Sequence, residues 1–391
     1  MDTAMKLFQN AEVFAPESIG RADVLVAAGQ VVALQPRSEG PLEIQGIPDL
    51  EVIDASDRRL TPGFIDQHIH ITGAGGKYGY GSMTPEVHVT DLVRCGTTTV
   101  VGLLGTDGTA RSLNSLYAKC ASLEDEGLSA WMLTSYFGLP PKTITGSTHD
   151  DLLFVDRVVG CKVALADVRS SYPTAHQLLA LLREIQVGGM ISGKGGVLHI
   201  HLGALPEGMD MLFELVEQYH VDIRRLSPTH VGRTEHLFEQ AKRFAELGGM
   251  VDLSTGGTQF TEPWKAVAQA YEEGVNLNRF TLSSDGNAGI GILNAQGELT
   301  GYKKAPIDLN LWNVQQLLRE TQVPAELCIG LLTSGPARTM GLKRKGRVAV
   351  GMDADFCLFD DRWDLQDVVS RGRFMMRGGS LTTTGNFAKG T

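Results

Sequence analysis

Apolar residues fall in short runs along the chain, and the spacing of these runs differs between the ends and the middle. Residues 22–34 form two apolar runs around a glycine-containing turn, which is typical of a β-hairpin. The same pattern recurs in three further segments, namely 46–56, 353–360 and the two arms around Arg371-Gly372. We therefore predict a small β-sandwich domain built from both termini, residues 1–59 together with 345–391.

In the middle of the chain, nearly continuous apolar runs alternate with helical patterns. Eight runs are candidate strands: 64–72, 97–105, 129–137, 161–167, 197–203, 226–232, 250–255 and 279–285. Helical spacing lies between several of them, at Leu212, Leu215, Val216 and Tyr219 and again at Leu237, Ala241, Phe244 and Ala245. Eight strand–helix units with buried strands predict a (β/α)₈ barrel over residues 60–344. A doubly wound parallel sheet is the alternative.

Composition narrows the class of protein. The 391 residues are 42% hydrophobic and 20% charged, which is globular composition. The net charge of −10 argues against a general nucleic-acid or anionic-membrane binder. The first residues lack the layout of a signal peptide, and no apolar run approaches the ~18 residues of a membrane span. Five dispersed cysteines without a CxxC pair predict reduced thiols in a cytoplasmic protein.

Several predicted strands carry polar residues that a barrel core would exclude. The first strand holds Asp66, His68 and His70, which share one face because alternate strand residues point the same way. The later strands add Lys162 on the fourth, His201 on the fifth, His230 on the sixth and Asp285 on the eighth. Barrel active sites form at the carboxyl ends of strands, so these residues are predicted to converge on a metal site. His199 has the same parity as His201, and we assign it to the core one layer deeper.

Several segments carry a resemblance to a known family. PGFIDQHIH (62–70), SSDGN (283–287) and TSGPARTMGL (333–342) are similar to motifs of the amidohydrolase superfamily. Five segments resemble its isoaspartyl dipeptidase branch, namely 63–70, 100–107, 131–147, 227–233 and 282–287. The likeness covers nearly the whole chain. It implies a binuclear metal-dependent hydrolase that cleaves the β-linked amide of isoaspartyl dipeptides with a metal-bridging hydroxide, in a homo-oligomer of up to eight subunits.

The resemblance also implies roles for the converging residues. Two divalent ions, usually zinc, would be held by His68, His70 and Asp285 on one side and by His201 and His230 on the other. Lys162 would bridge both ions as a carbamate formed with CO₂, which removes a cation from beside two dications. Asp285 would act as the catalytic proton acceptor and then donor.

Substrate-binding residues are expected on the loops after the strands. Arg169 and Arg233 would clamp a substrate carboxylate, because paired arginines bind carboxylates in bidentate geometry. Gly75 and Thr106 offer amide and hydroxyl donors on the first two loops. The glycine-rich segments 73–81 and 286–306 are long for such loops, and either a mobile lid or an ordinary surface loop fits them.

Three substrate-binding positions depart from the family pattern. Lys77 stands where the family has Glu, Phe137 where it has Tyr, and Gly289 where it has Ser. Tyr136 is adjacent to Phe137, but neighbouring strand residues point oppositely unless a bulge intervenes. Two interpretations stay open. The alignment shifts within the loops, or the substrate is another amide, such as an N-acyl amino acid or a cyclic amide. A non-catalytic scaffold is a third reading, and retention of all six ligands argues against it.

Overall fold

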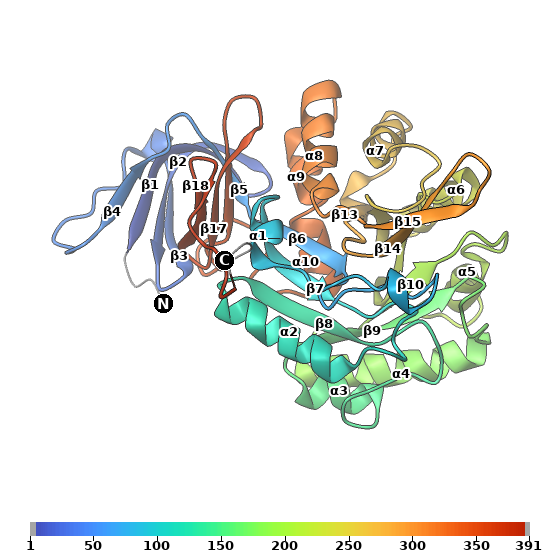
Figure 1. The fold of residues 1–391 in the computed structure, drawn as a ribbon. Coiled ribbons are helices and arrows are strands. Elements are labelled where there is room, and N and C mark those ends of the chain that lie inside the picture. Colours follow the sequence, from blue (N-terminus) through green and yellow to red (C-terminus); the bar gives the residue numbers. More distant parts are fainter. Residues whose placement is uncertain (1–4, 388–391) are drawn as a thin grey trace.

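Eight parallel strands form one sheet of the structure, a computed structural model that describes residues 5–387 (Figure 1). They lie side by side in chain order: β6 (Phe64–Ile69), β7 (Thr97–Gly102), β8 (Ser129–Ser135), β9 (Val158–Leu165), β10 (Val197–Leu202), β11 (Leu226–Thr229), β12 (Val251–Ser254) and β13 (Phe280–Ser283). Each overlaps one predicted apolar run. Neighbours in strict sequence order are the arrangement of a barrel, which confirms that prediction over the doubly wound sheet.

The barrel closes where the segment after β13 meets β6. The backbone N–H of Asp285 donates to the carbonyl of His68 at 3.1 Å, and that of His70 donates to the carbonyl of Gly286 at 3.1 Å. Ile69 and Gly286 form a parallel bridge at the same seam. The first and last strands of the barrel are therefore joined by backbone hydrogen bonds.

Helices surround this barrel (Figure 1). They are α1 (Val89–Val93), α2 (Leu113–Asp125), α3 (Thr148–Phe154), α4 (Ala175–Ser192), α5 (Asp210–Glu217), α6 (Glu235–Glu246), α7 (Pro263–Glu272), α8 (Leu309–Glu320), α9 (Ala325–Gly330) and α10 (Ser334–Met340). Both helical patterns of the sequence fall on helices, α5 and α6. Helix α5 ends before Tyr219, however, and His220 just beyond it takes a left-handed backbone conformation with φ 54°.

A second sheet is built from both ends of the chain, as the sequence predicts. Its strands are β1 (Lys6–Phe14), β2 (Ser18–Ala27), β3 (Gln30–Pro36), β4 (Glu51–Asp54), β5 (Arg59–Pro62), β16 (Phe356–Phe359), β17 (Leu365–Ser370), β18 (Arg373–Arg377) and β19 (Ser380–Leu381). Pairing of β5 with β16 joins the N-terminal strands to the C-terminal ones (Figure 1). The rings of Phe8 and Phe356 meet edge to face, with centroids 5.6 Å apart, in the core of this sheet.

The hairpins predicted for residues 353–360 and 46–56 are wrong. Segment 353–360 holds one strand, β16, which pairs with β5 and β17. Segment 46–56 holds a single short strand, β4, which pairs in parallel with β1. Its apolar content is only Val52 and Ile53 between charged neighbours, and Val52 is 54% exposed. With no second apolar arm to pair with, the strand instead pairs with the first residues of β1, whose later residues pair with β5.

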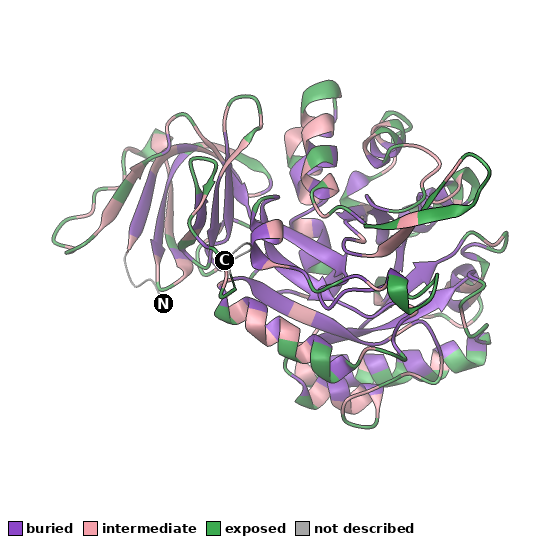
Figure 2. Cartoon of the chain, in the orientation of Figure 1, coloured by how far each residue is buried: buried purple, intermediate pink, exposed green. Residues whose placement is uncertain are grey.

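Three further features bear on the sequence predictions. Segment 286–306 contains a hairpin, β14 (Gly289–Leu293) with β15 (Leu299–Lys304), which is largely exposed (Figure 2). All five cysteines are buried and unpaired. Within residues 5–387, no helix combines the length and apolarity needed to cross a bilayer.

Candidate active site

A group of possible metal ligands lies at the barrel seam. Asp285 Oδ1 is 3.4 Å from His68 Nε2 and 3.3 Å from His70 Nε2. One ligand atom from each of the three residues lies within 4.8 Å of the others. The closing hydrogen bonds between the segment after β13 and β6 explain why residues so distant in sequence meet here.

The other predicted ligands adjoin this group. Lys162 is fully buried on β9, and its Nζ lies 3.3 Å from His68 Nε2. The ring of His230 is centred 4.8 Å from that of His68 and 4.5 Å from that of His201. The structure therefore brings all six predicted ligands to the carboxyl ends of the strands.

Burial sets the charge state of these side chains. Loss of solvent lowers the pKa of His68 to about 3 and holds the pKa values of His201 and His230 well below their ordinary range. Neutral imidazoles keep the lone pair that a metal ion needs. Burial also lowers the pKa of Lys162 to about 7, which brings its uncharged amine within reach at neutral pH.

One histidine has an open coordination position. His230 Nδ1 shares a hydrogen bond of 2.8 Å with Ser254 Oγ, while its buried Nε2 has no partner among the described residues. A buried polar atom without a partner is costly, and a bound cation would remove that cost. Neutral imidazoles beside the Asp285 carboxylate form a donor set that suits zinc or a similar divalent ion. The residues therefore fit a metal centre.

A second layer of side chains orients the histidines. His68 Nδ1 lies 2.8 Å from His199 Nε2, and His199 Nδ1 lies 2.9 Å from Ser227 Oγ. His199 is thus a buried histidine behind the ligands, as predicted. Sequence reasoning missed Ser227 and Ser254, because a serine inside a strand carries no pattern that separates it from ordinary core positions.

Backbone strain accompanies the ends of these strands. Ser135, Ala166, His230 and Asp285 all take left-handed conformations, with φ of 71°, 50°, 65° and 47°. Such conformations cost about 1–3 kcal/mol for residues with a side chain and persist where the surroundings impose them. Two of the four residues are predicted metal ligands, so the strain coincides with the site.

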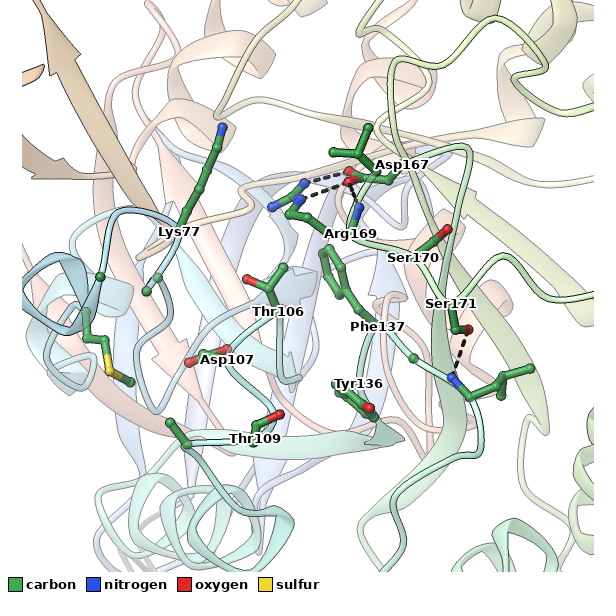
Figure 3. A pocket seen from close by; sticks show the side chains of 18 of the residues that line it. Lys77, Thr106, Asp107, Thr109, Tyr136, Phe137, Asp167, Arg169, Ser170 and Ser171 are labelled. Atoms are coloured by element: carbon green, nitrogen blue, oxygen red, sulfur yellow. Dashed lines mark hydrogen bonds and ion pairs between the residues drawn. The ribbon is translucent and has the colours of Figure 1, made fainter. Parts of the chain in front are cut away.

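Asp167 is a site residue that the sequence analysis missed. Its carboxylate receives Arg169 Nε at 2.8 Å and Arg169 Nη2 at 2.6 Å, and its Oδ2 lies 2.9 Å from His201 Nε2. Burial alone would raise the pKa of Asp167, but hydrogen bonds from Arg169 and His201 hold it far below its ordinary value. The predicted clamp Arg169 is therefore engaged by a neighbouring carboxylate in this structure (Figure 3).

A cavity of about 1060 Å³ is lined by Phe137, Asp167 and Arg169 among other residues (Figure 3). Six of the predicted substrate-binding residues line it: Gly75, Lys77, Thr106, Phe137, Arg169 and Arg233. The seventh, Gly289, is not among its lining residues. A Cβ atom at Gly289 would lie 2.8 Å from the Ser82 carbonyl oxygen and 3.2 Å from Gly75 Cα, so the first loop occupies the space of a side chain.

The structure shows which of Phe137 and Tyr136 faces the site histidines. The Phe137 ring is centred 4.3 Å from the His201 ring, and Arg169 Cζ lies 5.1 Å above it. Tyr136 instead packs its ring against Gly108 and Gly138. Residue 137 faces the histidines, and its phenyl ring offers no hydroxyl there.

Comparison with known proteins assigns the chain to a family. The chain matches the Amidohydrolase family over residues 59–385 and belongs to that family. The family is generally metal-dependent, and this chain is a hydrolase with a barrel and a terminal β-sandwich.

The structure is similar to a beta-aspartyl dipeptidase from Fervidobacterium islandicum AW-1, solved in complex with the beta-Asp-Leu dipeptide. That protein is 38% identical, the likeness covers 98% of this chain and 100% of that one, and the TM-score is 0.89. A dihydropyrimidinase from Brevibacillus agri shares the fold at 17% identity, with 97% of each chain covered and a TM-score of 0.67. A deacetylase from Brucella anthropi is 24% identical over 80% of this chain and 74% of its own length.

Proposed function

We propose that this chain is a metal-dependent hydrolase that cleaves the β-linked amide of isoaspartyl dipeptides and releases aspartate. The observation that carries the proposal is the group of His68, His70 and Asp285 at the mouth of the barrel. The substrate class is supported by the likeness to the beta-aspartyl dipeptidase that was solved with beta-Asp-Leu.

The residues would hold two divalent ions, with zinc as the expected metal. His68, His70 and Asp285 would hold one, and His201 and His230 the other. When bound, such ions polarise an amide carbonyl and lower the pKa of a water toward ~7. This cleavage chemistry and the metal identity stay part of the proposal.

Lys162 would join the two halves of the centre as a carbamate. Its pKa of about 7 leaves much of the amine uncharged near neutral pH. The uncharged nitrogen would add to the carbon of CO₂, forming an N–C bond and releasing one proton. The product is an anion with two oxygens, which suits a position between two cations better than an ammonium does.

The remaining steps fall to side chains of this chain. Asp285 would accept a proton from the attacking water and deliver it to the departing amine nitrogen. Arg233 and Arg169 would bind a substrate carboxylate, since both line the cavity. Phe137 would form an apolar wall beside His201 and limit the access of water.

A hydrolysis assay tests the proposal. Protein expressed with zinc and bicarbonate should release leucine from β-Asp-Leu, while α-Asp-Leu serves as the matched substrate with the other linkage. Metal content is measured on the same sample. Two bound ions per chain with no cleavage of any β-linked amide would overturn the proposed function. Assembly with further copies of the chain and a cytoplasmic location stay predictions of the sequence.

A second candidate function is hydrolysis of a related but different amide. The presence of Lys77 in the cavity lining favours it, because a lysine does not attract the free ammonium of an isoaspartyl residue.

A further inference from the structure

The charged side chains of the cavity are unevenly engaged. Its lining holds two carboxylates, Asp107 and Asp167. Asp107 pairs with Arg111 Nε at 2.8 Å and also accepts the backbone N–H of Gly105 at 3.1 Å. Asp167 is taken up by Arg169 and His201. Neither carboxylate of the lining is left to receive a cation from a ligand.

Two cationic side chains of the same lining are not engaged. Within residues 5–387, Arg233 forms no ion pair and its guanidinium makes no hydrogen bond to the protein. Lys77 likewise has no carboxylate partner in the described part of the chain, and its Nζ lies 5.4 Å from the centre of the Tyr78 ring. The cavity therefore presents unpaired positive charge from two different loops.

This excess of unpaired positive charge affects which acyl part of an amide substrate the cavity can bind. A free ammonium in the cavity would face Lys77 and Arg233 with no open carboxylate to compensate its lost hydration. A second carboxylate at the same place would pair with one of these cations. A neutral, acylated nitrogen would meet no charge repulsion.

We propose that the preferred substrate is a β-linked amide whose acyl part carries carboxylate but no free ammonium, such as an N-acyl-β-aspartyl or succinyl amide, and that Lys77 selects it. The proposal rests on the proposed hydrolysis of β-linked amides and narrows its substrate class to acyl parts without the ammonium of an isoaspartyl residue. Arg233 binds the first carboxylate, and Lys77, on the first loop of the same cavity, disfavours an ammonium there.

The test compares three substrates on zinc-loaded protein: β-Asp-Leu, N-acetyl-β-Asp-Leu and succinyl-Leu. The two substrates without ammonium are expected to have kcat/KM about two- to fivefold higher than β-Asp-Leu, the scale of one exposed charge interaction. Lys77→Glu should reverse this ratio, and Lys77→Gln should bring it close to one. Lys343→Glu makes the same charge change at an exposed lysine outside the cavity lining and should leave the ratio unchanged.

Binding of product fragments gives a second readout that does not need turnover. Calorimetry should show N-acetylaspartate binding more tightly than aspartate, with the order reversed in Lys77→Glu. If β-Asp-Leu is cleaved at least as well as its acylated form, and aspartate binds at least as tightly as N-acetylaspartate, the inference is wrong while the proposed function stands. If no β-linked amide is cleaved, the proposed function fails, and the fragment affinities alone decide the inference.

Discussion

The histidines at the strand ends and the loops around the cavity differ in burial and in how they are held in place. The histidines and Lys162 are buried, sit on or directly after strands, and are held by a second layer of hydrogen bonds. Lys77 and its neighbours lie on an exposed loop that packs against the β14–β15 hairpin, where the ring centres of Tyr78 and Tyr302 are 6.2 Å apart. The barrel fixes the reacting centre, whereas substrate preference can change through single loop residues without disturbing it.

The largest effect is expected from the inner region. Asp285→Asn removes the carboxylate that faces both His68 and His70, so kcat should fall by about 10³-fold and one metal ion should be lost. Kinetics and elemental analysis measure the two effects. Asp361→Asn, at an exposed position, is the matched control. Full activity in Asp285→Asn would remove this residue from the proton-transfer role.

The two arginines should separate binding from structure. Arg233→Met removes an unpaired guanidinium, and kcat/KM should fall by about 10²-fold with little change in Tm. Arg169→Met also leaves the buried Asp167 carboxylate beside His201 without its arginine partner, so the Tm of this variant should fall further. Equal Tm values for the two variants would contradict the role assigned to the Arg169–Asp167 pair.

His199 links the inner region to the barrel core. Replacing it with Phe breaks the hydrogen bond to His68 Nδ1, and zinc affinity measured by chelator competition should weaken by about 10- to 100-fold. His199→Gln keeps a polar group and should recover part of the affinity. A merely structural role would lower Tm in both variants without separating their zinc affinities.

Burial of Lys162 predicts a pH effect in metal-free protein kept free of CO₂. The pKa of this amine is about 7 in the folded chain and ~10.4 unfolded, so the unfolded chain binds an extra proton between these values. Burial of the charged Lys162 amine therefore destabilises the folded chain fully below pH 7, and this destabilisation decreases as the pH rises.

The free energy of unfolding of wild type, relative to Lys162→Met, should therefore increase by up to about 1.4 kcal/mol per pH unit between pH 7 and 8.5. Urea unfolding of both proteins measures this difference, in which shared contributions such as the cysteines cancel. A flat difference would show that Lys162 is protonated alike in both states.

The smallest effect is expected at Gly289, outside the cavity lining. Gly289→Ala forces the Ser82 carbonyl to shift, so KM should change by a few-fold and kcat hardly at all. Gly81→Ala lies on the same first loop with open space around its Cβ position and should change neither. A large loss of kcat in Gly289→Ala would show that the first loop shapes the reacting centre itself.

The difference between the strand ends and the loops also explains which parts of the site the sequence could predict. His68, His70, Lys162 and Asp285 interrupt apolar strands, and strand parity with barrel topology is enough to bring them together. Asp167 and Ser227 could not be assigned, because their roles depend on which neighbouring strand faces them. The packing of the first loop against Gly289 could not be predicted either, since loop packing leaves no periodic signal. The 46–56 hairpin prediction failed because this segment holds one short strand, whose partner β1 lies far away in the sequence.

The barrel seam has a consequence for how the protein matures. His68 and His70 are synthesised long before Asp285, and the three meet only after the last strand has docked on the first. An ion held by the three residues, as proposed above, would tie the first strand to the last and would stabilise the folded chain more as its occupancy rises. Uptake of such an ion at these three residues would require the whole barrel to be assembled, and its removal by a chelator is expected to loosen the junction first.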